Sequence, residues 1–181
     1  MATPESQNPS QTVSSEQPQY RVMLQKEQLV FSAAHFITFA GDICERLHGH
    51  NYGVKAEVVG PLDENEYVID FIAFRDALAE VVAQLDHRML LPADHSMITV
   101  DVHDAEVTTT FQCDGQPTKR WIFPEEDCII LPIANTTAEK LAWWIAKQVK
   151  TRLSGKVSDV DTLEVFVDEN HGQWGSCKIH W

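Results

Sequence analysis

Two amphipathic helical segments, each bordered by strand-like segments, are the feature that most constrains the fold of this chain. Apolar residues between positions 71 and 85 recur at the spacing of one buried helical stripe, which begins with Phe71, and Asp70 stands at the expected N-cap. A second helix is predicted to begin at Thr136, because residues 136–139 fit a capping box and apolar residues follow at helical spacing. Each helix must therefore bury one face against other elements.

Alternating apolar residues indicate strands on both sides of the two helices. A strand, or a bent pair of strands, is predicted from residue 22 towards His35, and further strands at residues 51–60, 163–167 and 177–181. The first two can pair antiparallel, with residues 37–47 as the connecting loop.

A long segment between the two helices, roughly residues 93–132, contains a hairpin signal. Its Asp-Gly step lies between two runs of β-prone residues, which is typical of a tight turn that joins antiparallel strands. The order of elements therefore predicts an α+β fold: an antiparallel four-stranded sheet with two helices on one face, plus an inserted β-hairpin.

The length of 181 residues favours one domain, which we place at residues 20–181 with the insertion at about 93–132. Residues 1–19 are rich in Ser, Gln, Pro and Glu and predict a disordered tail. No apolar run is long enough to cross a bilayer, and the N-terminus lacks the basic and then apolar pattern of a secretory signal. We therefore expect a cytoplasmic protein without a membrane segment.

The charge and the cysteines exclude several classes of protein. A formal net charge of −13 argues against nucleic acid or an anionic membrane as a partner, because both require a basic face. The four cysteines are widely spaced and form no CxxC pair, which disfavours a disulfide framework, a zinc ribbon and a thioredoxin-like site. Cys113, Cys128 and Cys177 are expected to be small buried apolar residues.

Three histidines are the candidate metal ligands. His48 and His50 precede a predicted strand two residues apart, so their side chains project to the same face, and His35 ends the partner strand. Three neutral imidazoles leave one open position on a tetrahedral zinc ion, the arrangement of a catalytic site. The alternatives are surface histidines beside a glycine turn, or a cupin, which the Val54-Lys55 pair disfavours because a cupin has Glu there.

Two further candidates lie near these histidines in sequence. Cys44, four residues before His48, would be a proton acceptor if the field of a metal lowered the pKa of its thiol; the alternative is a small buried apolar residue. Asp86 and His87 follow the first helix and form an acid–base pair in which the carboxylate fixes the imidazole tautomer. The alternative for His87 is a histidine that interacts with the helix dipole.

A family resemblance rests on motifs in a fixed order. FSAAH at 31–35, CERLHGHNY at 44–52, VIDF at 68–71, LDH at 85–87, NTTAEKLA at 135–142 and a closing strand with Glu169 resemble the 6-pyruvoyl-tetrahydropterin and 6-carboxy-tetrahydropterin synthase family. The resemblance spans residues 20–181 apart from 93–132, and CxxxHGH is its most specific part. It implies the T-fold, in which trimers close their sheets into a barrel, two trimers stack, and sites form between subunits.

The resemblance also implies roles for individual residues. The three histidines would bind Zn²⁺, Cys44 would accept a proton, Asp86 and His87 would complete a relay, and Glu169 would bind the pterin ring of 7,8-dihydroneopterin triphosphate. A carboxylate suits that role because the pterin edge presents two parallel N–H donors. The final strand reads Val-Asp-Glu-Asn where Glu-Thr is usual in the family, so Asp168 competes with Glu169.

The four-residue spacing between Cys44 and His48 resembles the bacterial 6-carboxy enzymes of 7-deazaguanine (queuosine) synthesis, which release acetaldehyde and triphosphate. Relatives that form the 6-pyruvoyl product have a longer gap. Other relatives have Glu in place of this Cys and act on dihydroneopterin in folate synthesis, which Cys44 disfavours. The remaining alternatives are 6-pyruvoyl-tetrahydropterin synthase activity, a pterin- or purine-binding protein without turnover, and a structural zinc module.

Overall fold

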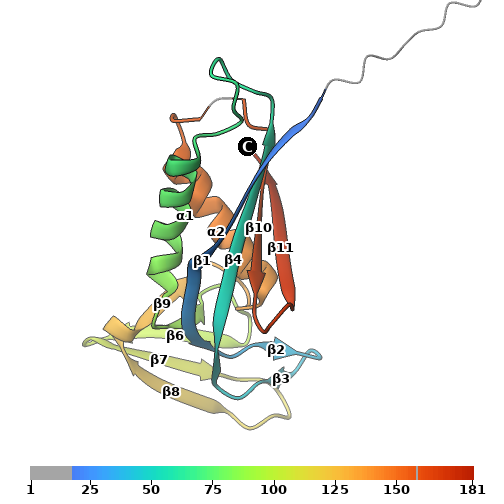
Figure 1. Ribbon diagram of the computed structural model, residues 1–181. Coiled ribbons are helices and arrows are strands. Elements are labelled where there is room, and N and C mark those ends of the chain that lie inside the picture. The colour runs from blue at the N-terminus through green and yellow to red at the C-terminus, as the bar shows by residue number, and fades with distance from the viewer. Residues whose placement is uncertain (1–17, 158) are drawn as a thin grey trace, which may run out of the picture.

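The main body of the protein is a six-stranded sheet with two helices on one of its faces (Figure 1). The computed structural model describes residues 18–157 and 159–181. The predicted disordered tail, residues 1–19, therefore lies outside the described residues except for its last two positions. In spatial order the strands are β11 (Trp174–His180), β10 (Thr162–Asp168), β4 (His48–Gly60), β1 (Tyr20–His35), β5 (Arg88–Pro92) and β9 (Cys128–Leu131).

Four of these strands form an antiparallel sheet, as the sequence predicted. β1 pairs with β4, which is the one pair that was predicted individually, β4 also pairs with β10, and β10 pairs with β11. β5 pairs parallel with β1, and β9 pairs parallel with β5, so the sheet is mixed and the predicted limit of four strands is wrong. Four consecutive residues of β5 are buried, as in strands covered on both faces. This strand therefore lacks the alternating pattern by which the other strands were predicted.

Helix α1 (Phe71–Leu85) begins where the sequence predicted. Oδ1 of the N-cap residue Asp70 accepts hydrogen bonds from the backbone N–H groups of Ile72 at 2.7 Å and Ala73 at 2.9 Å. Phe71, which was predicted to open the buried stripe, is 55% exposed instead. The stripe consists of Phe74, Ala77, Leu78, Val81, Val82 and Leu85.

Helix α2 (Ala138–Leu153) begins two residues after its predicted start, and the predicted capping box is wrong. Its N-cap residue Thr137 makes no side-chain capping hydrogen bond. Thr136 is fully buried and its hydroxyl donates to the carbonyl of Phe36 at 3.0 Å. This threonine therefore ties the start of α2 to the end of β1 instead of capping the helix.

The insertion is a three-stranded antiparallel sheet of β6 (Ile98–His103), β7 (Glu106–Phe111) and β8 (Lys119–Pro124), where the sequence predicted a hairpin. The predicted Asp-Gly turn does join two of its strands, β7 and β8, and Gly115 there has φ +79°. β6 was missed because only its first residue is fully buried. A short 3-10 turn, η1 (Glu125–Asp127), leads from β8 to β9.

The inserted sheet lies across the end of the main sheet at which β1 ends and β4 begins (Figure 1). The connection between β1 and β4, which was predicted as a loop, contains a small hairpin of β2 (Thr38–Phe39) and β3 (Ile43–Cys44). A large apolar cluster lies between the helices and the main sheet. A second, smaller cluster packs under the insertion and contains Phe36, Cys44, Met89, Leu91, Ile98, Val107 and Phe111.

Among the described residues, no helix has the length and apolar character that a membrane span requires.

Candidate metal centre

Strand pairing brings the three predicted histidines together. His35 is the last residue of β1 and His48 the first of β4, and the two are direct partners in the antiparallel ladder. His50 lies two residues further along β4, opposite Ala33. One ring nitrogen from each of the three histidines lies within 4.8 Å of the other two, which is a spacing that can hold a metal ion.

Hydrogen bonds to the backbone fix the tautomers of two of these rings. Nδ1 of His35 lies 3.0 Å from the carbonyl oxygen of Thr136, and Nδ1 of His48 lies 2.8 Å from that of Arg46. Because a carbonyl oxygen only accepts, Nδ1 carries the proton in both rings and Nε2 keeps a lone pair. Burial lowers the pKa of His35 to about 4, and the neighbouring His48 and His50 lower it further against the effect of the Thr136 bond. His35 is therefore neutral at neutral pH, as a metal ligand must be.

The Nε2 atom of His35 has no hydrogen-bond partner in the described part of the chain and is suited to bind a metal ion. It is buried without a hydrogen bond among these residues, and it faces Oε1 of Glu169 at 3.4 Å. With the proton on Nδ1, this contact joins two acceptors and is no ion pair. Burial also raises the pKa of Glu169. A cation beside the two atoms would relieve their repulsion, so the donor set of three imidazoles suits a divalent metal.

Glu169 opens into a cavity of about 400 Å³ next to the histidines. The cavity lies between the first residues of α2 and the start of β11, which approach each other closely at Gly175. A Cβ atom at Gly175 would lie 2.7 Å from that of Ala138, so a side chain there would push the two elements apart. The cavity is lined by Ile37, Thr137, Ala138, Glu139, Glu169, Gln173, Trp174 and Gly175.

Asp168, the competing carboxylate, is committed to the turn after β10. Its two oxygens accept hydrogen bonds from the backbone N–H of Gly172 at 2.9 Å, and Oδ1 also accepts from Gln173 at 3.1 Å. Glu169, in contrast, lines the cavity beside His35. Of the two carboxylates, Glu169 is therefore the one available to a ligand.

Cys44 occupies the second apolar cluster and is 5% exposed. Its thiol donates a weak hydrogen bond to the carbonyl oxygen of Glu45 at 3.6 Å. Burial raises the pKa of the Cys44 thiol, and the ammonium of Lys119 opposes this rise. The packing of Cys44 thus matches the small apolar residue that the sequence offered as the alternative, and its role as a proton acceptor stays a prediction. The other cysteines are half-buried.

Glu45 was given no role by the sequence reasoning, although it belongs to the CERLHGH motif. Its Oε2 lies 3.9 Å from Nδ1 of His48, and its side chain is 38% exposed. The carboxylate is therefore beside one of the candidate ligands and open to solvent. Its position one residue after Cys44 and three before His48 was the signal that could have identified it.

Asp86 and His87 form the predicted pair at the end of α1. Oδ2 of Asp86 lies 3.0 Å from Nδ1 of His87, whose side chain is 83% exposed. Oδ1 of Asp86 accepts the backbone N–H of Ser32 at 2.8 Å, and the N–H of His87 donates to the Ser32 carbonyl at 2.7 Å. The hydrogen bond from Ser32 is the main reason that the pKa of Asp86 is lowered. The pair is thereby fixed to β1 three residues before His35.

His87 and His50 line the same cavity, which has a volume of about 540 Å³ and also exposes Ser32, Asn51 and Arg88. The structure therefore places His87 at the same cavity as one of the three candidate ligands. Cys44 does not line this cavity.

Tyr52 is a further residue at the centre that the sequence did not single out. It is fully buried, and its ring lies edge-on to those of His35 and His50, with centroids 5.7 and 5.5 Å apart. Its hydroxyl has no hydrogen-bond partner within the described residues. Burial raises the pKa of this hydroxyl, and the carboxylates of Glu169 and Glu45 raise it further.

Comparisons with known proteins show the family of the chain. The family model described as 6-pyruvoyl tetrahydropterin synthase matches residues 24–179. A protein of Methanocaldococcus jannaschii, provisionally named a 6-carboxy-5,6,7,8-tetrahydropterin synthase, is 34% identical over 82% of this chain and 88% of its own length. A dihydroneopterin monophosphate aldolase of Pyrococcus furiosus is 37% identical over 60 residues, which are 33% of this chain and 50% of that protein.

A solved structure has the same fold. It is a 6-pyruvoyltetrahydropterin synthase of Plasmodium vivax in which a catalytic glutamate is replaced by alanine. It superposes with a TM-score of 0.81 at 27% identity, over 91% of this chain and 100% of that one. The match of the family model over most of the chain, the relative at 34% identity and the shared fold lead to one conclusion: the chain belongs to the 6-pyruvoyl tetrahydropterin synthase family of pterin-converting enzymes.

Proposed function

We propose that the protein is a zinc-dependent 6-carboxy-tetrahydropterin synthase. It would convert 7,8-dihydroneopterin triphosphate and water to 6-carboxy-5,6,7,8-tetrahydropterin, acetaldehyde and triphosphate, a step of 7-deazaguanine (queuosine) synthesis. The observation that carries the proposal is the group of three imidazoles beside the Glu169 cavity, with Nε2 of His35 buried and lacking a partner among the described residues. The name of the archaeal relative supports the choice of product.

Each residue at the centre has a proposed role. His35, His48 and His50 hold the zinc, and Glu169 accepts the two parallel N–H donors of the pterin edge in a bidentate contact. Such a contact would also offset the effect of burial on the Glu169 carboxylate. When bound, the metal supplies Lewis acidity at the substrate's side-chain hydroxyls.

The protein groups handle the protons. Cys44 would take a proton from the carbon next to a side-chain hydroxyl of the substrate, and His87 would relay a proton, with Asp86 fixing its orientation. The hydrogen bonds of Asp86 to Ser32 and His87 support this orienting role. Cys44 is buried in an apolar cluster. Its side chain must therefore become accessible to the substrate before its sulfur can take this proton.

Identification of the products tests the proposal directly. Zinc-loaded protein is incubated with 7,8-dihydroneopterin triphosphate, and the pterin and the small fragments are identified by mass spectrometry. Acetaldehyde and the 6-carboxy pterin in equal amounts are expected. A pyruvoyl product without acetaldehyde would assign the sister activity, and binding without any product would leave a pterin-binding protein.

A second candidate function is an aldolase-type cleavage of a dihydroneopterin phosphate, with Glu45 as the base. The observation that favours it is the solvent-exposed carboxylate of Glu45, 3.9 Å from His48. Two relatives support it: the P. furiosus protein is named a dihydroneopterin monophosphate aldolase, and the P. vivax synthase has a catalytic glutamate. The Cys-Glu pair at 44–45 therefore offers two different bases to one metal centre.

A matched pair of variants separates the two bases. Under the first proposal, Cys44→Ala lowers the rate of acetaldehyde release by about 10²- to 10⁴-fold, whereas Glu45→Gln leaves most of it. Under the second candidate, Glu45→Gln removes cleavage of a dihydroneopterin phosphate and Cys44→Ala spares it. If neither variant changes either rate, neither residue is a base.

We also propose that the working form is a homo-oligomer, either a trimer or a dimer of trimers. Residues 20–25 of β1 pair only with β4, and β11 pairs only with β10, so the described main sheet ends in unpaired strand edges. Unpaired edges at the two sides of one sheet can join head to tail and close a ring. The exposed apolar side chains Tyr20, Met23 and Val30 on β1 support such a contact.

A further inference from the structure

The inserted sheet reaches the segment that carries both candidate bases. Lys119, the first residue of β8, directs its Nζ atom at two consecutive backbone carbonyls. It donates a hydrogen bond to the carbonyl oxygen of Cys44 and another, at 3.4 Å, to that of Glu45. One ammonium group from the insertion therefore holds the chain at the residues that precede His48.

The register of the inserted sheet explains why Lys119 points towards the main body. Lys119 pairs with Phe111, which in turn pairs with Ile98, and both of these apolar side chains are buried. Lys119 thus lies on the inner face of the sheet, whereas the next residue, Arg120, is exposed. An ammonium on an inner face must find acceptors, and the two carbonyl oxygens supply them.

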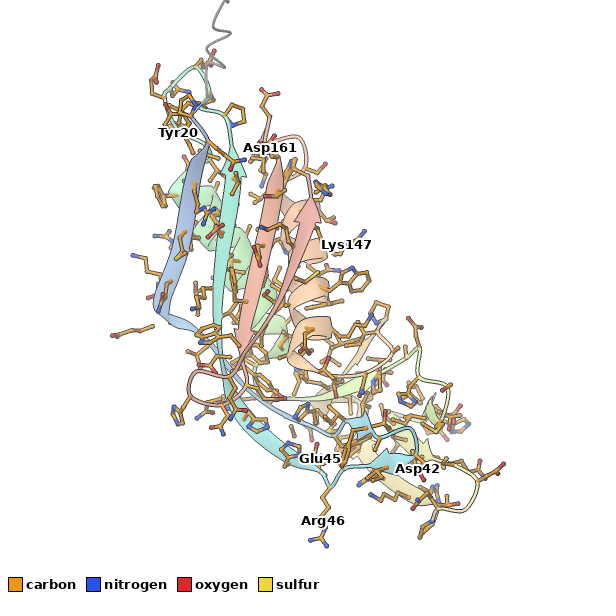
Figure 2. The ribbon with its side chains drawn as sticks, turned by 90° about the vertical axis from the view of Figure 1, so that its right-hand side faces the viewer. Tyr20, Asp42, Glu45, Arg46, Lys147 and Asp161 are labelled. Atoms are coloured by element: carbon orange, nitrogen blue, oxygen red, sulfur yellow. The ribbon has the colours of Figure 1, made fainter. Side chains whose placement is uncertain are left out.

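Other contacts of the insertion surround the same segment. Trp121, two residues after Lys119 and on the same face, stacks on Phe36 with ring centroids 4.4 Å apart. Nε2 of Gln116 donates to Oδ2 of Asp42 at 3.0 Å. Figure 2 shows Asp42 and Glu45 at this end of the protein, where the side chain of Arg46 extends away from the body. The insertion therefore contacts the chain directly after His35 and again before His48.

The ammonium also affects the side chains that it positions. The Glu45 carbonyl that Lys119 contacts is the same one that accepts the thiol hydrogen of Cys44. The positive charge of Lys119 counteracts the burial that raises the pKa of this thiol.

We propose that Lys119 is a positioning residue of the active centre: by holding the carbonyls of Cys44 and Glu45, it fixes the backbone from which these two side chains project, directly before His48. The insertion at residues 93–132 is then part of the catalytic apparatus. This inference rests on the proposed function, and it applies whichever of the two side chains is the base.

Three variants test this role by kinetics. Lys119→Met keeps the aliphatic stem and removes the donors, Lys119→Arg restores charge and donors, and Arg120→Met is the control with the same loss of charge on the outer face. Lys119→Met is expected to lower kcat by about tenfold to about a hundredfold, with KM and zinc content within about twofold of wild type. Lys119→Arg should recover most of kcat, and Arg120→Met should match wild type.

Hydrogen exchange tests the same role without turnover. The amide of Glu45 donates to the carbonyl of Ile37 at 2.9 Å, so a peptide that covers residues 42–47 reports how well the segment is held. This peptide should exchange faster in Lys119→Met than in Arg120→Met. If wild type converts neither pterin substrate, the proposed function fails, while the exchange rates still decide the role of Lys119.

Three results would overturn the inference. They are a Lys119→Met protein whose kcat and exchange match Arg120→Met, an equal loss of kcat in Lys119→Arg and Lys119→Met, or a loss of zinc that accompanies the loss of kcat. Should Lys119→Met fail to fold, Lys119→Leu, which also lacks charge and donors, takes its place, and the same three results apply to it.

Discussion

At His35, one ring nitrogen is tied to a backbone carbonyl and the other is left for a metal. The Nδ1 bond to Thr136 orients the ring, and Thr136 is itself held by its bond to Phe36. The residue that the sequence assigned to a helix cap is therefore a support for a metal ligand. Such supporting bonds fix the tautomer and the direction of a ligand before the ion arrives.

Tyr52 allows a prediction at the same scale. Tyr52→Phe removes a buried hydroxyl that has no partner among the described residues. Because an unpaired buried hydroxyl destabilises a fold, the free energy of unfolding of the metal-free variant should equal that of wild type or exceed it by up to about 1 kcal/mol. Urea denaturation measures this difference. A loss of more than about 1 kcal/mol would mean that the hydroxyl is hydrogen-bonded in the folded protein.

The sequence could predict which side chains lie together where they are a few residues apart on one strand. His48 and His50 are two residues apart, and strand alternation alone predicts that they project to one face. The packing of Tyr52 against two of the histidines and the approach of Glu45 to His48 depend on ring and side-chain directions. Strand alternation also places Tyr52 on the face of His48 and His50, and Glu45 belongs to the same motif, so the sequence held a signal for both residues that was not used.

At the scale of single elements, the starts of the two helices differ and can be compared. Asp70 accepts two backbone hydrogen bonds at the start of α1, while Thr137 makes no side-chain cap at the start of α2. Asp70→Ala should lower the free energy of unfolding by about 1 kcal/mol. Thr137→Ala should change it by less than about 0.5 kcal/mol. Denaturant titration of both variants checks this, and equal effects would contradict the capping geometry.

The junction between α1 and β1 predicts a dependence of stability on pH. The pKa of folded Asp86 lies below its ordinary value of 3.8, chiefly because of the hydrogen bond from Ser32. Its carboxylate therefore stabilises the fold above pH 3.8, and this contribution disappears as the pH falls through the lowered pKa. Because the side chain is 40% exposed, solvent screening reduces the effect.

Asp86→Asn keeps an acceptor for Ser32 but removes the charge, so it isolates the ionised form. Its free energy of unfolding should lie below that of wild type at neutral pH, and the gap should shrink as the pH falls below 3.8. Urea titrations at several pH values measure the gap. A gap that stays constant across this range would show that Asp86 titrates alike in the folded and unfolded states.

Elements with one buried face were predicted well, and elements buried on both faces or on neither were not. The strands β1, β4, β10 and β11 and the stripe of α1 follow the alternation or helical spacing of their apolar residues. β5 is almost wholly buried and β6 is mostly exposed, so neither shows a period. For this reason the sequence did not predict that β5 belongs to the main sheet, or that the insertion has a third strand.

For the whole molecule, the unpaired edges of the described main sheet predict an assembly. Light scattering after size-exclusion chromatography should give the mass of three or six chains at micromolar concentration. A chain that stays monomeric under these conditions would require another explanation for the open edges of β1 and β11.

The net charge of −13 also bears on the whole molecule, because the proposed substrate carries a triphosphate. Arg88 follows His87 in sequence and lines the same cavity of about 540 Å³, where it provides local positive charge. The zinc ion would add to that charge. Local positive groups therefore have to outweigh the field of an acidic protein at this one site.

The proposed function requires that the three imidazoles of His35, His48 and His50 converge on one metal ion. Anomalous diffraction at the zinc edge, from crystals of zinc-loaded protein, tests it most directly. We expect one zinc per chain, bound by a nitrogen from each of His35, His48 and His50, with Glu169 alongside. A zinc-loaded crystal in which the metal lies elsewhere, or in which these rings point away from each other, would contradict it.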